Sequence, residues 1–317
     1  MTSTQAETTR ASVGDSGKKW IPGPLLPQKY RRTNRPKLWL EIALIAIGYE
    51  LYTLTRLAAP THEAASHQRG WDILNLEHYL GLNFEHTVNH WVYSVRWLAF
   101  SMNVYYGTLH FIVPIVVLIW VYLKFPDRYR SVRTVMCTMT LLALFGFYFY
   151  SLCPPRLLPG ADFIDTFKLL NPWGQSAATS DGVAGLGTST NEFAAMPSLH
   201  IGWSTWCAIV IARLATRNWV KILGIAYPFA TFAVIIGTAN HYALDAVGGL
   251  VVLGLGFLFQ RILQGRPAIS APPPVPSPVP STVPAEVASV PKQPVGSDAP
   301  AASAAQRETS ARPGASG

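Results

Sequence analysis

Two short segments of the chain place ionisable residues at the ends of long apolar runs. Residues 197–200 read Pro-Ser-Leu-His, and residues 240–245 read Asn-His-Tyr-Ala-Leu-Asp. In the second segment His241 and Asp245 are four residues apart, which puts them on one face of a helix. A carboxylate that accepts the N–H of one imidazole nitrogen leaves the other nitrogen basic, so this pairing would prepare a nucleophile or a general base.

The first segment has the residue types of a helix start. Proline suits the first turn of a helix and serine suits its cap, so we expect Ser198, Leu199 and His200 at a helix N-terminus. Unpaired N–H groups and the positive end of the helix dipole favour phosphate binding there. A single histidine near a membrane surface is usually a packing residue. His200 and His241 together, each at the end of an apolar run, indicate one phosphate pocket with an acid and a nucleophile.

At these residues the chain resembles the type 2 phosphatidic acid phosphatase superfamily, to which the vanadium haloperoxidases also belong. Residues 197–200 match its second motif, usually Pro-Ser-Gly-His, with Leu199 in place of the glycine. His241 and Asp245 match its third motif, in which the histidine is the phosphorylated nucleophile and the aspartate orients it. The sequence Cys-Pro-Pro that leads to Arg156 is similar to a reduced first motif that keeps its phosphate-binding arginine.

The resemblance covers about residues 150–250 and departs from the usual motifs at two cations. Ile235 stands six residues before the expected nucleophile, where the family has an arginine, and Phe149 stands seven residues before the first-motif arginine, where the family has a lysine. Together with the Ser-Leu-His sequence, these losses are more similar to the branch that contains inositolphosphotransferases and inositol phosphorylceramide synthases. The resemblance therefore implies a phosphatase or a phosphotransferase.

The resemblance also implies a role for each residue of the motifs. His241, oriented by Asp245, would attack phosphorus, and His200 would protonate the leaving oxygen. The implied phosphate-binding residues are Arg156, Ser198 and Leu199. The implied substrate is a lipid phosphate or diphosphate, and the phosphohistidine intermediate would be cleaved by water or by an alcohol such as inositol. No cofactor is implied.

The composition is that of a polytopic membrane protein, since 50% of the 317 residues are hydrophobic and only 13% are charged. We predict an all-α membrane helix bundle over residues 38–265, with six transmembrane helices long enough to cross a bilayer of roughly 30 Å. The predicted spans are 38–58, 103–124, 131–152, 198–216, 219–239 and 242–263. Residues 71–101 carry an apolar stripe interrupted by charges, which predicts an amphipathic helix lying in the membrane interface.

Basic residues decide the predicted orientation. With six spans, the basic loops near 124–133 and 213–221 fall on the same side as the basic segment 1–37, whereas a seventh span over 71–101 would reverse them. We therefore expect a plasma-membrane protein with both termini in the cytoplasm. The motif residues then lie on the outer face, beside a long loop (153–197) that could cover the site as a lid. A cytosolic nucleotide-dependent enzyme is hard to reconcile with that placement.

Four more polar residues in or beside the predicted spans are candidates for lining a head-group cavity. They are Glu50, Arg56, His110 and Asn240. For an ionisable group inside a span, a structural hydrogen-bond network is the commoner explanation. Two sets of metal-ligand residue types have spacings that match no binding pattern, so we predict no metal site and no disulfide. These sets are Asp162, Asp165 and Glu192, and Cys137, Cys153 and Cys207.

The C-terminal segment 266–317 is rich in proline, alanine and serine, which predicts a disordered cytoplasmic tail. The formal net charge of +8 suits anionic lipid head groups better than nucleic acid. Two other functions stay open. One is a metal- or haem-binding membrane protein that uses His200, His241 and His110. The other is a transporter or scaffold in which the motifs have lost activity.

Overall fold

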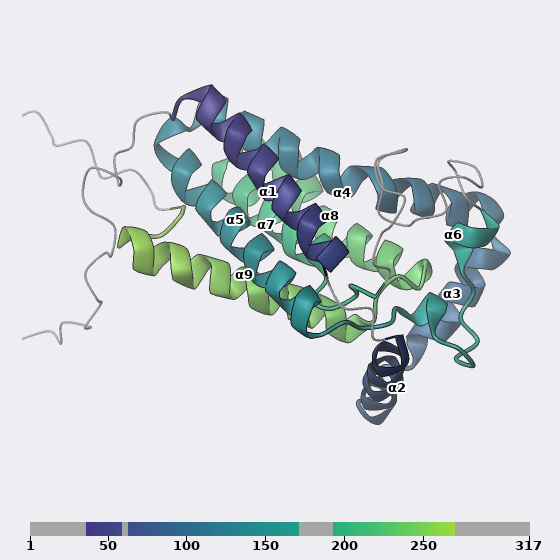
Figure 1. Ribbon diagram of the computed structural model, residues 1–317. Coiled ribbons are helices and arrows are strands. Elements are labelled where there is room, and N and C mark those ends of the chain that lie inside the picture. Colours follow the sequence, from purple (N-terminus) through teal and green to yellow (C-terminus); the bar gives the residue numbers. More distant parts are fainter. Residues whose placement is uncertain (1–35, 59–62, 171–192, 270–317) are drawn as a thin grey trace, which may run out of the picture. The chain divides into compact units, whose positions relative to one another are not determined.

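The computed structural model describes residues 36–58, 63–170 and 193–269. Within these ranges the chain folds into helices and their connections, with one isolated parallel bridge between Leu152 and Ala194 and no strand (Figure 1). The predicted all-α class is confirmed. The predicted disordered tail, nearly all of the basic N-terminal segment and the centre of the predicted lid lie outside the described residues.

Six long helices correspond to the six predicted spans. They are α1 (Leu38–Ala58), α4 (Arg96–Lys124), α5 (Pro126–Phe149), α7 (Leu199–Leu214), α8 (Asn218–Gly237) and α9 (Ala243–Gln264). Four of them, α4, α5, α8 and α9, are long and apolar enough to cross a membrane. Helix α7 and the part Leu38–Gly48 of α1 are apolar but shorter. The prediction of a membrane protein is therefore supported, and the prediction of six spans is supported in part.

Helix α7 is the centre of the bundle, because it packs against α4, α5, α8 and α9. Its Trp206 is fully buried, and the indole N–H donates to the carbonyl oxygen of Val132 on α5 at 3.1 Å. The outward faces of the surrounding helices carry large exposed apolar side chains, such as Ile222 and Phe229 on α8 and Leu258 on α9. A lipid environment stabilises apolar surface of this extent.

The single interfacial helix predicted over residues 71–101 is wrong in detail. The region is divided among α2 (Glu63–Tyr79), α3 (Phe84–Ser94) and the first turns of α4. Figure 1 shows α2 and α3 at one end of the long helices. Two of the charges that interrupt the apolar stripe, Glu77 and Glu85, are buried, because both bind backbone N–H groups at the start of α9. The other two, Asp72 and Arg96, are exposed.

The connection between α5 and α7 carries two short elements at the same end of the bundle. These are the 3-10 helix η2 (Pro155–Leu157) and α6 (Thr166–Leu169). Arg156 lies in η2, and Asp165 caps α6 by accepting the backbone N–H of Lys168 at 3.0 Å. Asn103 of α4 holds α6 in place by donating to the Thr166 carbonyl oxygen at 2.9 Å. The predicted first motif is thereby fixed to the bundle.

Candidate active site

His241 lies in the turn between α8 and α9, not on the helix that its spacing from Asp245 predicted. Tyr242 is the N-cap of α9, and Asp245 reaches back over the helix start to accept the Tyr242 backbone N–H at 3.0 Å. The same carboxylate oxygen lies 3.3 Å from Nδ1 of His241. The contact between the two side chains therefore arises from helix capping rather than from one helical face.

The surroundings of His241 determine where its proton lies. Nδ1 faces two acceptors, the Asp245 carboxylate and the carbonyl oxygen of Ala195 at 2.8 Å, so Nδ1 carries the hydrogen. Nε2 then presents a lone pair. This nitrogen lies 3.3 Å from Nδ1 of His200 and 3.5 Å from the hydroxyl of Tyr106. His241 is thus held in the tautomer that a nucleophile requires.

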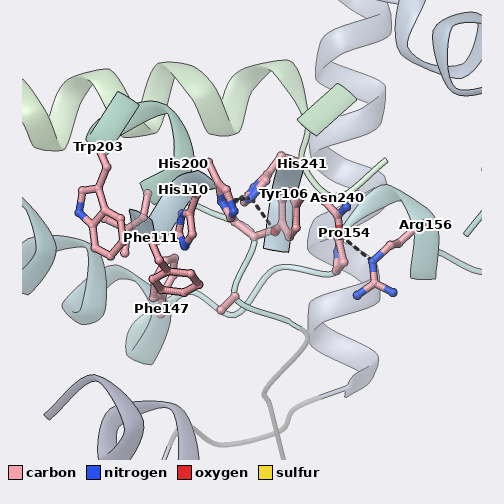
Figure 2. A pocket seen from close by; sticks show the side chains of 13 residues that line it. Tyr106, His110, Phe111, Phe147, Pro154, Arg156, His200, Trp203, Asn240 and His241 are labelled. Carbon is pink, nitrogen blue, oxygen red and sulfur yellow. Dashed lines mark hydrogen bonds between the residues drawn. The ribbon is translucent and has the colours of Figure 1, made fainter. Parts of the chain in front are cut away.

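His200 occupies the second position of α7, in a stack of four rings. Its imidazole lies between Tyr106, with ring centroids 4.0 Å apart, and His110, with centroids 3.9 Å apart. Trp203 stacks on the far side of His110 at 4.9 Å. Figure 2 shows these rings along one wall of the pocket, with Nδ1 of His200 turned toward His241. The stack fixes the plane of the His200 ring.

Ser198 is the N-cap of α7, as predicted, but it does not line the pocket. Its hydroxyl is fully buried and has no hydrogen-bond partner among the described residues. Its backbone N–H donates to the carbonyl oxygen of Asp245 at 3.0 Å, which ties the starts of α7 and α9 together. Leu199 does line the pocket, at the first turn of α7 where backbone N–H groups have no partner within the helix.

Arg156 lies in the pocket with its guanidinium almost fully buried. Its Nε donates to Oδ1 of Asn240 at 2.9 Å, and Nη1 pairs with Asp165 at 3.0 Å. Its backbone N–H donates to the carbonyl oxygen of Ala239 at 2.9 Å. Asn240, which the sequence marked only as a cavity-lining candidate, also donates to Thr238 at 2.7 Å and so orients the arginine. Figure 2 shows Arg156 and Asn240 at the end of the pocket opposite Trp203.

The structure does not bring every candidate to this place. His110 lines the pocket, but Glu50 lies on α1 with an exposed side chain and is not among the described lining residues. The side chain of Arg56 lies outside the described residues. His110, His200 and His241 are not among the groups of metal-ligand residues whose ligand atoms converge within the described chain.

Sequence reasoning missed two acids that hold the backbone beside His241. Oε1 of Glu85 accepts the Ala243 N–H at 2.5 Å, and Oε1 of Glu77 accepts the Leu244 N–H at 2.7 Å. Asp245 accepts the preceding N–H, that of Tyr242. Carboxyl groups from α2, α3 and α9 therefore accept three consecutive backbone N–H groups at the start of α9, where the helix itself offers no acceptor. Burial raises the pKa of both Glu77 and Glu85, and the charge of Glu77 raises the pKa of Glu85 further. The sequence feature that could have indicated this role is the presence of the two acids within an apolar helical stripe.

The pocket has a polar side and an apolar side. Around an empty volume of about 580 Å³, part of it open to solvent, it is lined by Tyr106, His110, Phe111, Phe147, Pro154, Arg156, Ala194, Ala195, Leu199, His200, Trp203, Asn240 and His241. Figure 2 shows the aromatic side chains at one end and the arginine at the other. Such a lining suits a ligand with an anionic head and an apolar body.

Comparison with known proteins gives one result. A family described as PAP2 superfamily matches residues 71–259, which is more than half of the chain. No curated protein and no solved structure matches. The matched region begins within α2 and ends within α9, so it contains η2, α7 and the turn before α9.

Proposed function

Because the chain belongs to the PAP2 superfamily, we propose that it is an integral membrane phosphatase or phosphotransferase acting on a lipid phosphate through a phosphohistidine. The observation that supports this most is the tautomer of His241. Its Nδ1 proton is shared by Asp245 and the Ala195 carbonyl oxygen, so the Nε2 lone pair faces the pocket beside His200.

The first half-reaction forms a phosphorus–nitrogen bond. The phosphate binds beside Nε2 of His241, with its non-bridging oxygens on Arg156 and on the N–H groups of the first turn of α7. Nε2 of His241 attacks phosphorus as the bond to the leaving oxygen breaks, and His200 gives that oxygen a proton. His200 is the titratable pocket residue nearest to the attacking nitrogen, with Nδ1 3.3 Å from Nε2 of His241.

The second half-reaction regenerates the enzyme. Neutral His200 takes a proton from water or from an alcohol such as inositol, whose oxygen attacks phosphorus as the bond to Nε2 breaks. Asp245 keeps the His241 ring in place during both steps, since it also caps α9. A phosphomonoester donor then gives free phosphate with water and a new phosphomonoester with an alcohol. A phosphodiester donor gives a phosphomonoester with water and a new phosphodiester with an alcohol.

The charge of the pocket favours a singly charged donor. Among the described lining residues Arg156 is the one permanent cation, and Asp165 pairs with it at 3.0 Å. Ile235, at the position of the missing family arginine, is fully buried in an apolar cluster, and Phe149 is largely exposed. A phosphodiester carries one negative charge and a phosphomonoester nearly two, so the diester is better matched. This supports transfer of a lipid head group over simple hydrolysis.

The orientation of the helices supports a pocket on the outer face. The ends of the helices remote from the pocket carry a set of basic residues: Lys124, Arg128, Arg130, Arg133, Arg213, Arg217, Lys221 and Arg261. By the positive-inside rule such ends lie in the cytoplasm. The substrate would then reach the pocket from the outer leaflet of the plasma membrane, which is the localisation that we propose.

The test is to replace the nucleophile and keep the fold. In detergent-solubilised full-length protein, His241→Gln is expected to lower turnover of a phosphodiester lipid by at least about 100-fold. His78→Gln, an exposed histidine on α2, is the matched control and should keep full activity. A donor labelled in its phosphate should leave an acid-labile label on the wild type and none on His241→Gln. Equal turnover and equal labelling of the two variants would remove His241 as nucleophile.

A further inference from the structure

Three side chains with metal-binding atoms meet outside the catalytic pocket. His86 and His90 lie on α3, and Asp162 lies in the connection between η2 and α6. Nε2 of His86 is 3.3 Å from Oδ2 of Asp162, and Nε2 of His90 is 4.0 Å from the same oxygen. One ligand atom from each residue lies within 4.8 Å of the others. The three groups converge although 76 residues separate His86 from Asp162.

The spacing of these atoms is close to that of a tetrahedral metal site. Bonds of about 2.0–2.1 Å to zinc place neighbouring ligand atoms roughly 3.3 Å apart. His86 and Asp162 already have that separation, and Nε2 of His90 lies 4.0 Å from the same carboxylate oxygen, so it must move closer to join the site. Histidines at i and i+4 lie one above the other on a helix, so one turn can present both imidazoles to one ion. The two rings here are 4.2 Å apart and tilted by 31°.

The backbone that carries the aspartate is fixed independently of any ion. Asn89, on the same helix as the histidines, accepts the Ile164 N–H at 2.8 Å and donates to the Ile164 carbonyl oxygen at 3.2 Å. The same side-chain nitrogen donates to Gly237 at 3.0 Å. Asp162 itself has a left-handed backbone, with φ of 56°, which aspartate and asparagine tolerate. The hydrogen bonds of Asn89 therefore fix the loop that carries the Asp162 carboxylate next to α3.

We propose that His86, His90 and Asp162 bind a first-row divalent transition metal ion, for which Zn²⁺ is the probe, with water in the fourth position. Two imidazoles and one carboxylate suit zinc better than calcium or magnesium, which prefer oxygen ligands. On binding, Nε2 of His90 exchanges its 2.8 Å contact with the Asp162 carbonyl oxygen for the metal. The side chains of the two histidines are about two-fifths exposed, so the ion can enter from solvent.

A metal ion at this site would link α3 to the connection between α5 and α7, which also carries Arg156. Asp162 is three residues before Asp165, which pairs with Arg156 and caps α6. An ion that joins Asp162 to α3 would stabilise that connection against local opening. This proposal does not depend on the proposed catalysis, because metal binding and thermal stability can be measured without a substrate.

The experiment is a spectroscopic titration of full-length protein in detergent after removal of metal with a chelator. Wild-type protein should bind one equivalent of Co²⁺ with the visible absorption of a tetrahedral ion, and Zn²⁺ should displace it. The double variant His86→Gln/His90→Gln should lose that absorption, and His78→Gln should keep it. Zn²⁺ should raise the melting temperature of the wild type and not that of the double variant.

A second variant keeps the test decisive if the double variant folds poorly. Asp162→Asn retains a residue that tolerates the positive φ and removes the charged ligand, so it should melt like the metal-free wild type and bind Co²⁺ more weakly. Absorption that is unchanged in both variants, no saturable Co²⁺ binding to the wild type, or displacement of Co²⁺ by Ca²⁺ would each overturn the proposal.

Discussion

A single methyl group at Gly249 tests whether the proposed catalytic role of His200 and His241 depends on the contact between α7 and α9. The two helices meet where Gly249 lies against the carbonyl oxygen of Ser198, the residue that precedes α7. A Cβ atom built on Gly249 would lie 2.3 Å from that oxygen, whereas ordinary contacts begin at 3.4 Å. Because the atom it meets is backbone, no side-chain rotation can relieve the overlap. Gly249→Ala must therefore separate the helix starts by about 1 Å.

The expected magnitude follows from the position of the histidines on those helices. His200 is the second residue of α7, and His241 is fixed to the start of α9 by Asp245. A separation of about 1 Å would open their 3.3 Å contact and misplace the attacking nitrogen, which costs on the order of 100-fold in rate. Overpacking of this kind also lowers the free energy of unfolding by about 1–3 kcal/mol.

The assay pairs turnover of a phosphodiester lipid with thermal unfolding in detergent. Gly254→Ala is the matched control, since Gly254 is on the same helix and has no atom within 4 Å of an added Cβ. Alanine is the better helix former by about 0.5–1 kcal/mol, so the control should keep its activity and melt at the same or a higher temperature. If Gly249→Ala behaves like Gly254→Ala in both measurements, the inference that this contact sets the catalytic geometry is wrong.

Two further predictions concern pH and orientation. The pKa of Glu85 is raised above its ordinary value of 4.5 in the folded protein, as is that of Glu77, so the folded state keeps protons that the unfolded chain releases. The free energy of unfolding should therefore fall as pH rises from about 5 to 9, and Glu85→Gln, measured by thermal unfolding, should show a smaller fall; a steeper one would contradict the buried-acid assignment. For orientation, a cysteine at Lys168 should react with a membrane-impermeant thiol reagent on intact cells, whereas one at Arg217 should react only after lysis. The reverse pattern would contradict a pocket on the outer face.

The long helices were predictable because each is a long apolar run between polar residues. The predicted span 219–239 corresponds to Asn218–Gly237, and the predicted span 242–263 corresponds to Ala243–Gln264. Hydropathy was less informative for α7, which is shorter than its predicted range because Ser198 is a cap outside the helix and the helix ends at Leu214. Packing against four neighbours, rather than length, accounts for its central place.

The details of the site were less predictable, because one spacing fits more than one local structure. Four residues between His241 and Asp245 fit one helical face, and they equally fit an aspartate that caps the helix and a histidine that precedes it. Acids within an apolar stripe, such as Glu77, look like a water-facing edge until the helix start that they bind is known. The stacking of Tyr106 and His110 on His200 joins α4 to α7, which no local pattern reveals.

The acids that hold the start of α9 also define the smallest part of the chain able to carry the proposed chemistry. Helix α1 packs against α5, and the family match leaves it out. By contrast, deletion of α2 or α3 would leave a buried backbone N–H without an acceptor within three residues of His241. Each lost acceptor would lower the free energy of unfolding by about 1–3 kcal/mol. A minimal fragment must therefore include the part of α2 that carries Glu77, although the histidines themselves lie more than a hundred residues further on.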